Sequence, residues 1–295
     1  MTRALFEAAR PQQWVKNLLV FVPLLAHHGP FDRAHLGAAL ASFGVFGLAA
    51  SAGYLLNDVL DLEHDRRHPA RRHRPLASGR LLPAPALAAA GVLVLASTAL
   101  AALTLPGRFG LFLGAYVLGS ALYSLVLKRV VVLDVLVLSA LYTVRLGAGG
   151  AATATWVSPW LLVFSGFLFL GLAFLKRAVE IRDVGGAEEA DARLPGRGWV
   201  PSDRPFLEAV GSTAGYVAVL VLALYASSAQ VRALYERPAV LWLAAPALLY
   251  WQTRVWLLAR RGLVRGDPVV FALRDPASYA TAGWILACAV VAGPR

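Results

Sequence analysis

The sequence feature that most restricts the fold of this chain is a series of apolar stretches that match the thickness of a lipid bilayer. A transmembrane helix needs about 20 apolar residues. Nine stretches approach that length, near residues 17–29, 36–56, 82–104, 109–127, 130–149, 157–175, 207–228, 238–258 and 277–292. Hydrophobic residues make up 58% of the chain, which excludes an ordinary soluble domain. The sequence therefore predicts an all-α, polytopic membrane protein with nine transmembrane helices in one bundle, in which residues 1–295 form a single integral-membrane domain.

The basic residues gather in the loops at one side of the predicted membrane. The formal net charge is +11, but Lys and Arg lie in short loops and form no single basic face, so we expect no nucleic-acid partner. The positive-inside rule places the N-terminus and the long polar loops 57–81, 176–206 and 259–276 in the cytoplasm. Only five basic residues lie in the loops assigned to the outside: Arg33, Arg108, Arg232, Arg237 and Arg295. We expect a multi-pass protein of the cell membrane with a cytoplasmic active site and an external C-terminus.

An acidic motif, NDVLDLEHD, occupies residues 57–65 at the end of the second apolar stretch. Asp58, Asp61 and Asp65 fall within a sector of about 60° on a continuous helix. Acids contribute little to membrane topology, so a solvated loop does not explain them. Mg²⁺ takes one or two carboxylates and completes its shell with water and phosphate oxygens. The arginines that follow suit phosphate, so this segment predicts a Mg²⁺–pyrophosphate site at the membrane surface.

This motif resembles the NDxxDxxxD motif of the UbiA superfamily of membrane prenyltransferases. Residues 74–79, RPLASG, resemble the RPLxxG element that follows it in that family. There the aspartates bind Mg²⁺ and a diphosphate in a cavity that opens to the membrane. The resemblance implies catalytic roles for Asn57, Asp58 and Asp61, and it implies Mg²⁺ binding by Asp58, Asp61 and Asp65.

Two further segments look like one branch of that family, the decaprenyl-phosphate phosphoribosyltransferases. Residues 10–21, RPQQWVKNLLVF, look like the RPxQWxKNLLVF opening of the branch, and residues 123–129, YSLVLKR, look like its YSxxLKR turn. The residues alone leave open whether these segments hold only interfacial anchors and ordinary loop charges. The resemblance implies substrate-binding residues, namely Lys16, Asn17, Arg74, Tyr123 and Lys128.

The segment FLKRAVEIRD, residues 174–183, occupies the place of the second acidic motif of the family, DxxxD. Lys176, Glu180 and Asp183 share one helical face at spacings i, i+4 and i+7. The segment departs from the family pattern because Lys stands at the first acidic position and Glu at the second. A plain Lys–Glu pair on a helix surface is the alternative reading. The departure suggests a site that handles more anion with less metal, with Lys176, Arg177 and Glu180 as substrate-binding residues.

The resemblance implies Mg²⁺-dependent transfer of 5-phosphoribose from phosphoribosyl diphosphate to a polyprenyl (decaprenyl) phosphate, for the synthesis of cell-wall arabinan precursors. The alternative is a prenyltransferase that moves a prenyl group from a prenyl diphosphate to an aromatic or small polar acceptor. An ion-coupled transporter more often shows paired repeats with broken helices at the bilayer midplane, whereas the charge here gathers at one surface. The sequence allows a homo-oligomer. It also leaves open whether Arg145, deep in the fifth stretch, faces the cavity, pairs or reaches the interface.

Overall fold

The computed structural model describes residues 2–26, 32–67, 71–184 and 196–293, and within these ranges the chain is helical and contains no β-strand. It divides into two compact units. Unit 1 comprises Met1–Val157 and Pro195–Gly198, and unit 2 comprises Ser158–Leu194 and Trp199–Arg295. The predicted all-α class is confirmed.

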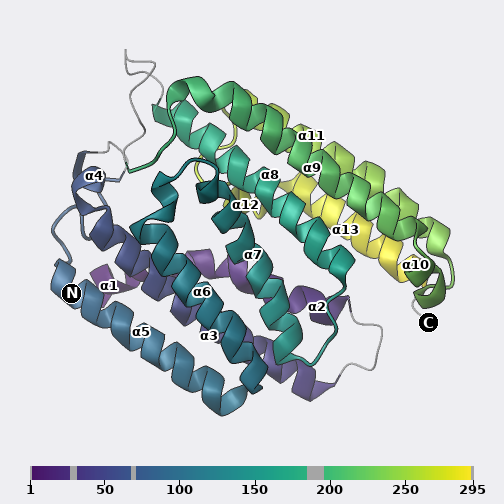
Figure 1. Ribbon diagram of the computed structural model, residues 1–295, viewed down its shortest axis with the longest axis horizontal. Helices are drawn as coiled ribbons and strands as arrows, with labels where there is room; N and C mark the ends of the chain where they lie inside the picture. Colours follow the sequence, from purple (N-terminus) through teal and green to yellow (C-terminus); the bar gives the residue numbers. More distant parts are fainter. Residues whose placement is uncertain (1, 27–31, 68–70, 185–195, 294–295) are drawn as a thin grey trace. The chain divides into compact units, whose positions relative to one another are not determined.

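Unit 1 contains the acidic motif and the N-terminal signature segment. Its elements, which Figure 1 shows in purple to teal, are α1 (Thr2–Ala9), the 3₁₀ helix η1 (Pro11–Phe21), α2 (Val22–Leu25), α3 (Arg33–Leu60), α4 (Leu62–Arg67), α5 (Pro83–Thr104), α6 (Gly107–Leu125), the 3₁₀ turn η2 (Leu127–Arg129) and α7 (Leu133–Ala152). The core of this unit joins η1, α3, α6 and α7 around Phe46, which is fully buried. Its ring packs edge-on against Phe109 and Tyr116, with centroids 5.8 and 5.0 Å away. The core therefore holds η1 against three long helices.

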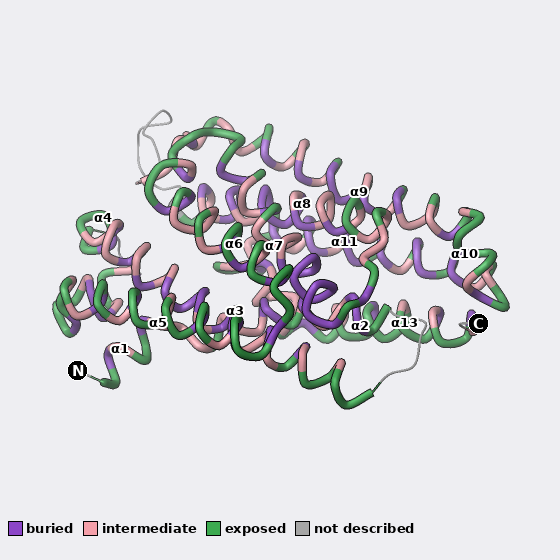
Figure 2. The backbone as a smooth tube through the Cα atoms, turned by 60° about the horizontal axis from the view of Figure 1, so that its bottom comes forward, coloured by how far each residue is buried: buried purple, intermediate pink, exposed green. Residues whose placement is uncertain are grey.

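The exposed face of α5 in unit 1 is apolar, as a lipid-facing surface must be. In α5 only 17% of the most apolar window is buried, against 56% in α3. Leu87, Val92, Leu95 and Leu103 of α5 are exposed, and Figure 2 shows exposed positions recurring along this helix. A soluble protein rarely exposes so continuous an apolar face, so lipid is the natural solvent for α5.

Unit 2 contains the remaining helices. These are α8 (Pro159–Val184), η3 (Pro201–Asp203), α9 (Arg204–Ser227), α10 (Ala229–Leu234), η4 (Pro238–Leu243), α11 (Ala244–Arg260), α12 (Pro268–Ala272) and α13 (Pro276–Ala292). Helices α8 and α9 approach closely at glycine, because a Cβ added to Gly171 would lie 3.0 Å from the carbonyl oxygen of Gly211. Small residues allow such contacts between membrane helices.

Among the described residues, six helices are long and apolar enough to cross a membrane: α3, α5, α6, α7, α8 and α9. Helix α13 is apolar but shorter, and the eighth predicted stretch is shared between η4 and α11. The expectation of a transmembrane α-helix near 17–29 differs most from the structure, since η1 extends to Phe21 and only the short α2 follows among the described residues. The predicted multi-span membrane protein is confirmed, whereas the number nine stays a prediction.

Candidate active site

The acidic motif lies at the junction of α3 and α4. Helix α3 ends at Leu60, and Asp61 forms its C-cap before α4 begins. The expectation of one continuous helix is therefore wrong. The main chain nevertheless donates from Asp61 to Asn57 (2.9 Å) and from Asp65 to Asp61 (2.8 Å). Because these i to i−4 bonds keep the two helices nearly in register, the three aspartates still gather, and all three are buried.

Two arginines hold two of the aspartates. Arg74 Nη1 lies 2.6 Å from Asp65 Oδ2 and 3.3 Å from Asp58 Oδ1, so it bridges both carboxylates. Arg10 forms an ion pair with the same Asp58 oxygen. Sequence reasoning placed Arg74 in the site but left out Arg10, although Arg10 opens the N-terminal signature. The two buried acids and these partly exposed arginines therefore form one ion-pair network.

The turn that follows α4 positions Arg74. The hydroxyl of Ser78 donates to the Arg74 carbonyl oxygen (2.8 Å), and the amide of Leu81 donates to the Pro75 carbonyl oxygen (2.9 Å). Leu76 anchors the turn in a core cluster with α1 and α3. Gly79 has a φ of 77°, a conformation that favours glycine. The RPLASG element thus forms a folded turn that directs its arginine towards the aspartates.

Arg10 reaches Asp58 from an unusual backbone conformation. Its φ and ψ are 52° and 57°, in the left-handed region that residues other than glycine rarely adopt. The Arg10 guanidinium lies over the Tyr54 ring, 5.3 Å from the centroid. The indole of Trp14 fixes the segment that follows Arg10 by donating to Ser51 Oγ (2.9 Å). A left-handed conformation at a residue other than glycine is strained, and it persists where surrounding contacts hold it in place, which is frequent at functional sites.

Lys128 holds the third aspartate. Its buried ammonium donates to Asp61 Oδ1 (2.6 Å) and to Asn57 Oδ1 (3.1 Å), while the Asn57 amide donates to Asp61 Oδ2 (3.0 Å). Burial lowers the pKa of Lys128, an effect that the hydrogen bond to Asp61 opposes. The YSLVLKR turn therefore brings Lys128 to the acidic motif, 67 residues away in sequence.

The other predicted substrate-binding residues of unit 1 contact protein groups. Tyr123 donates to Asp134 Oδ1 (2.8 Å) and accepts from Arg197 Nη1 (3.0 Å). Lys16 and Asn17 are buried on η1, and Asn17 Oδ1 accepts from Arg145 Nε (2.9 Å). Their substrate contacts stay predictions.

In unit 2, α8 extends through residues 174–183, the segment that occupies the place of the second acidic motif. Lys176 Nζ lies 3.3 Å from Asp267 Oδ2, and Arg177 forms an ion pair with Glu180. Asp267 also caps α12 by accepting from the amide of Val269 (3.0 Å). The second motif therefore presents basic side chains beside acids, and not a pair of carboxylates.

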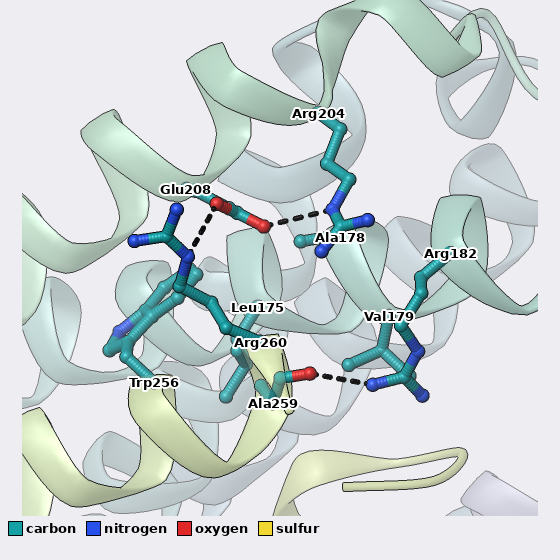
Figure 3. Close-up of a pocket in the computed structure, with 9 residues that line it drawn as sticks. All are labelled: Leu175, Ala178, Val179, Arg182, Arg204, Glu208, Trp256, Ala259 and Arg260. Carbon is teal, nitrogen blue, oxygen red and sulfur yellow. Dashed lines mark hydrogen bonds and ion pairs between the residues drawn. The ribbon is translucent and has the colours of Figure 1, made fainter. Parts of the chain in front are cut away.

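A hollow in unit 2 contains none of the predicted site residues (Figure 3). Glu208 of α9 accepts from Arg204 Nε (2.9 Å) and lies 3.3 Å from Arg260 Nε of α11. Arg182 of α8 donates to the Ala259 carbonyl oxygen (2.7 Å). These contacts join three helices, so the hollow is a product of helix packing.

The acidic motif offers Mg²⁺ a limited donor set. Asp58 Oδ2 and Asp65 Oδ1 are buried and accept no hydrogen bond, and the latter lies 3.9 Å from Arg71 Nη1. Both oxygens of Asp61 already accept from Lys128 and Asn57. Within the described ranges no three acid, His or Cys side chains surround one metal position. Since Mg²⁺ needs only one or two carboxylates besides water and phosphate, Asp58 and Asp65 fit it, whereas Asp61 fits only if Lys128 moves.

Residues 18–273 match the model of the UbiA prenyltransferase family. The chain is 36% identical over 275 residues to nodulation protein NoeC of Azorhizobium caulinodans, covering 92% of this chain and 87% of NoeC. It is also 36% identical to the uncharacterized protein y4nM of Sinorhizobium fredii, covering 96% of this chain but only 54% of y4nM, so it spans about half the length of that relative.

Two further comparisons concern named enzymes and known folds. Decaprenyl-phosphate phosphoribosyltransferase of Mycobacterium tuberculosis is 39% identical over 179 residues, which cover 59% of each chain. A UbiA homolog from Archaeoglobus fulgidus, solved bound to DMAPP and Mg²⁺, superposes with a TM-score of 0.72 at 16% identity and covers 96% of this chain and 98% of its own. The second likeness concerns the fold alone.

Proposed function

Because the chain belongs to the UbiA prenyltransferase family, we propose that it transfers 5-phosphoribose from phosphoribosyl diphosphate to a polyprenyl phosphate such as decaprenyl phosphate. The products are polyprenylphosphoryl-5-phosphoribose and pyrophosphate, and the lipid product supplies precursors of cell-wall arabinan. The acceptor is a membrane lipid, which suits an integral membrane enzyme. The decaprenyl-phosphate phosphoribosyltransferases at 36–39% identity, which cover 59–60% of this chain, support the transferred group and the acceptor.

The observation that carries the proposal is the pairing of three buried aspartates with protein cations. Arg10 and Arg74 hold Asp58 and Asp65, and Lys128 holds Asp61. A diphosphate offers those cations equivalent oxygens, so its arrival frees carboxylate oxygens for a metal. When bound, Mg²⁺ neutralises charge on the pyrophosphate leaving group and so favours its departure. The network therefore suits a metal–diphosphate ligand better than a neutral one.

The basic second motif supports a sugar donor over a prenyl donor. The proposed reaction involves a diphosphate, the 5-phosphate of the sugar and the phosphate of the lipid, whereas prenyl transfer involves only the diphosphate. Lys176 and Arg177 stand where the family pattern has an acidic motif, and basic side chains suit phosphate. We assign these two residues to the additional phosphate charge.

The reaction requires only displacement at the anomeric carbon. An oxygen of the lipid phosphate forms a bond to C1 of the ribose, while the bond from C1 to the pyrophosphate oxygen breaks and its electron pair leaves with pyrophosphate. The lipid phosphate is already an anion at neutral pH, so no residue needs to remove a proton. Positioning and charge stabilisation are the tasks left to the protein.

Incubation of the purified chain with Mg²⁺, labelled phosphoribosyl diphosphate and polyprenyl phosphate tests the proposal, and we expect a labelled lipid. Asp58→Asn should lower the rate about 100-fold or more, since it removes a carboxylate that would hold Mg²⁺ against the leaving group. Asp32→Asn is the matched control. Asp32 is exposed and caps α3, and Asn caps helices equally well, so its activity should equal that of the wild type.

Two results would contradict the proposal. Consumption of a prenyl diphosphate with an aromatic acid, and not of phosphoribosyl diphosphate, would establish the prenyltransferase alternative. Full activity of Asp58→Asn would show that the acidic motif does not hold the leaving group.

A further inference from the structure

A three-residue segment, residues 196–198, lies against the acidic motif. It belongs to unit 1, although α8 before it and η3 after it belong to unit 2. A Cβ added to Gly196 would lie 3.8 Å from Asp61 Oδ1, the oxygen that accepts from the Lys128 ammonium. Gly196 has a φ of 74°, a conformation that favours glycine. The main chain at Gly196 therefore passes close to the Lys128–Asp61 pair.

The other end of the segment packs on the turn that carries Lys128. A Cβ added to Gly198 would lie 2.4 Å from the carbonyl oxygen of Arg129 and 2.9 Å from Cγ2 of Val131. Glycine allows the two main chains to approach this closely. Residues 196–198 thus run from Asp61 to the residue after Lys128, whose side chain is 1% exposed. The segment therefore lies across the ion pair.

Arg197 fastens the middle of the segment. Its Nη1 donates to the Tyr123 hydroxyl (3.0 Å), and its guanidinium lies 5.8 Å from the centroid of the same ring. Tyr123 in turn donates to Asp134 Oδ1 (2.8 Å), and Asp134 is fully buried in the first turn of α7. A carboxylate only accepts, so the tyrosine proton points to Asp134 and a lone pair points to Arg197. The order guanidinium, phenol, carboxylate gives charge assistance to both hydrogen bonds.

The Lys128 ammonium needs such a constraint to meet an anion in one geometry. Lysine carries a point charge on a flexible four-carbon chain, so the position of its ammonium depends on what packs around it. A covered ion pair also excludes water, and electrostatic interactions strengthen where water is absent. A segment fixed across Lys128 therefore controls where the ammonium lies and how strongly it attracts phosphate.

We propose that Arg197 is a positioning residue: through Tyr123 and Asp134 it holds residues 196–198 across the Lys128–Asp61 pair, so that the Lys128 ammonium meets a diphosphate in a fixed place. The diphosphate rests on the proposed function, whereas the cover over Lys128 follows from contacts within unit 1. Arg197 lies outside every segment that carries the family resemblance.

Acylation of amines in the full chain in detergent tests the cover, because the chain has only three lysines: Lys16, Lys128 and Lys176. Peptide mass spectrometry after a short pulse of N-acetoxysuccinimide gives the rate at each one. In the wild type Lys128 should react slowly and Lys176, whose side chain is 27% exposed, should react faster. Arg197→Met should speed acylation of Lys128 about 10- to 100-fold, because opening the segment then breaks one charge-assisted hydrogen bond fewer. The rate at Lys176 should not change.

Arg108→Met is the matched control. Arg108 is exposed and donates to the Ala151 carbonyl oxygen, so its loss should leave Lys128 slow. Gly198→Ala is a second variant, which keeps Arg197. Its methyl group meets the main chain of the turn and pushes the segment away, so it should also speed acylation of Lys128.

A double variant shows whether Arg197 acts through Tyr123. Tyr123→Phe keeps the ring and removes both hydrogen bonds of the hydroxyl, so by itself it should also speed acylation of Lys128. Combined with Arg197→Met it should add little, because members of one hydrogen-bond chain are not additive. Arg197→Lys keeps a charged donor and should restore most of the protection of Lys128.

Binding of Mg²⁺–pyrophosphate, measured by calorimetric titration, tests the positioning itself. Arg197→Met should bind this probe about 10-fold more weakly than the wild type, because Lys128 no longer has a fixed place. Arg108→Met should bind it as the wild type does. The probe carries no sugar and no prenyl group, so the result does not depend on the identity of the donor.

The inference is overturned if Lys128 of the wild type reacts as fast as Lys176, or if Arg197→Met leaves its rate unchanged; should that variant fail to fold, Tyr123→Phe decides. It is also overturned if Arg197→Met exposes Lys128 but binds Mg²⁺–pyrophosphate as the wild type does. Failure of the proposed function looks different. Phosphoribosyl diphosphate then gives no labelled lipid, while the protection of Lys128 and the binding of Mg²⁺–pyrophosphate remain.

Discussion

At the scale of single residues, the acidic motif is a buried charge network and not an open cluster of carboxylates. Arg74 bridges Asp58 and Asp65, and Lys128 holds Asp61. Removing one member of a buried ion pair typically costs about 3–5 kcal/mol, because the remaining charge has no partner. The protein cations therefore stabilise the buried acids.

The titration of Lys128 gives a prediction about pH. Burial lowers the pKa of Lys128 below its ordinary value of 10.5. At pH values between the folded-state pKa of Lys128 and 10.5, Lys128 carries its proton more often in the unfolded chain than in the folded chain. The free energy of unfolding should therefore rise with pH in that window. Lys128→Met removes the titrating group and should flatten this rise. Chemical unfolding between pH 8 and 10.5 measures it.

The neighbouring Arg129, which is exposed, provides the control for that experiment. Arg129→Met removes one positive charge from the same turn and should keep most of the rise with pH, because Arg129 is the smallest of the causes that lower the pKa of Lys128. An equal slope in wild type and Lys128→Met would show that Lys128 does not titrate differently in the folded protein.

At the scale of elements, the unusual feature is η1, an 11-residue 3₁₀ helix. Such runs rarely exceed three or four residues. Two glycines, one on α3 and one on α7, allow η1 to pack closely. A Cβ on Gly47 would lie 2.6 Å from the Trp14 ring, and a Cβ on Gly149 would lie 2.1 Å from the Val20 carbonyl oxygen. Packing against α3 and α7 therefore holds η1 in a conformation that local preference alone does not favour.

Gly149→Ala should destabilise the protein, because the added methyl group meets main chain, which cannot rotate away. Overpacking of this kind costs about 1–3 kcal/mol, so thermal unfolding should show a lower Tm. Gly110→Ala is the matched control on α6, where a Cβ meets nothing within 4 Å, and it should leave the Tm unchanged or raise it. Equal Tm values for the two variants would mean that η1 does not pack against α7 at Gly149.

At the scale of the whole molecule, the arrangement in the bilayer follows from charge. The described residues contain six helices that can cross a membrane. The positive-inside rule places the acidic motif on the cytoplasmic side, where a water-soluble sugar diphosphate is available. We propose this orientation together with a cytoplasmic N-terminus and an external C-terminus.

Cysteine labelling tests the orientation, because the chain has a single cysteine, the buried Cys288. In a Cys288→Ser background, a membrane-impermeant maleimide added to intact cells should label Gly107→Cys and should not label Glu63→Cys. Both positions are exposed, but the proposed orientation places Gly107 outside and Glu63 in the cytoplasm. Permeabilised cells should show both labelled. The reverse pattern in intact cells would place the acidic motif outside.

The long apolar helices and the acidic motif can be predicted from local sequence. The apolar stretches near 36–56, 82–104 and 109–127 correspond to α3, α5 and α6, because the free energy of transfer into lipid adds up residue by residue along a helix. The composition of residues 57–65 also singled out the aspartates that the folded chain buries, because carboxylates at the end of an apolar helix are costly without a partner. Neither inference requires knowledge of which distant segments meet.

Tertiary structure alone decided what those residues contact. Arg10 and Asp58 are 48 residues apart, and Arg145 and Asn17 are 128 apart, so no spacing rule along one helix pairs them. Likewise, the 3₁₀ helix of residues 11–21 packs so closely against Gly47 and Gly149 that a Cβ at either position would clash with it. Hydropathy reports the environment of a residue, whereas ion pairs and close packing depend on the positions of two chain segments, which only the folded protein specifies.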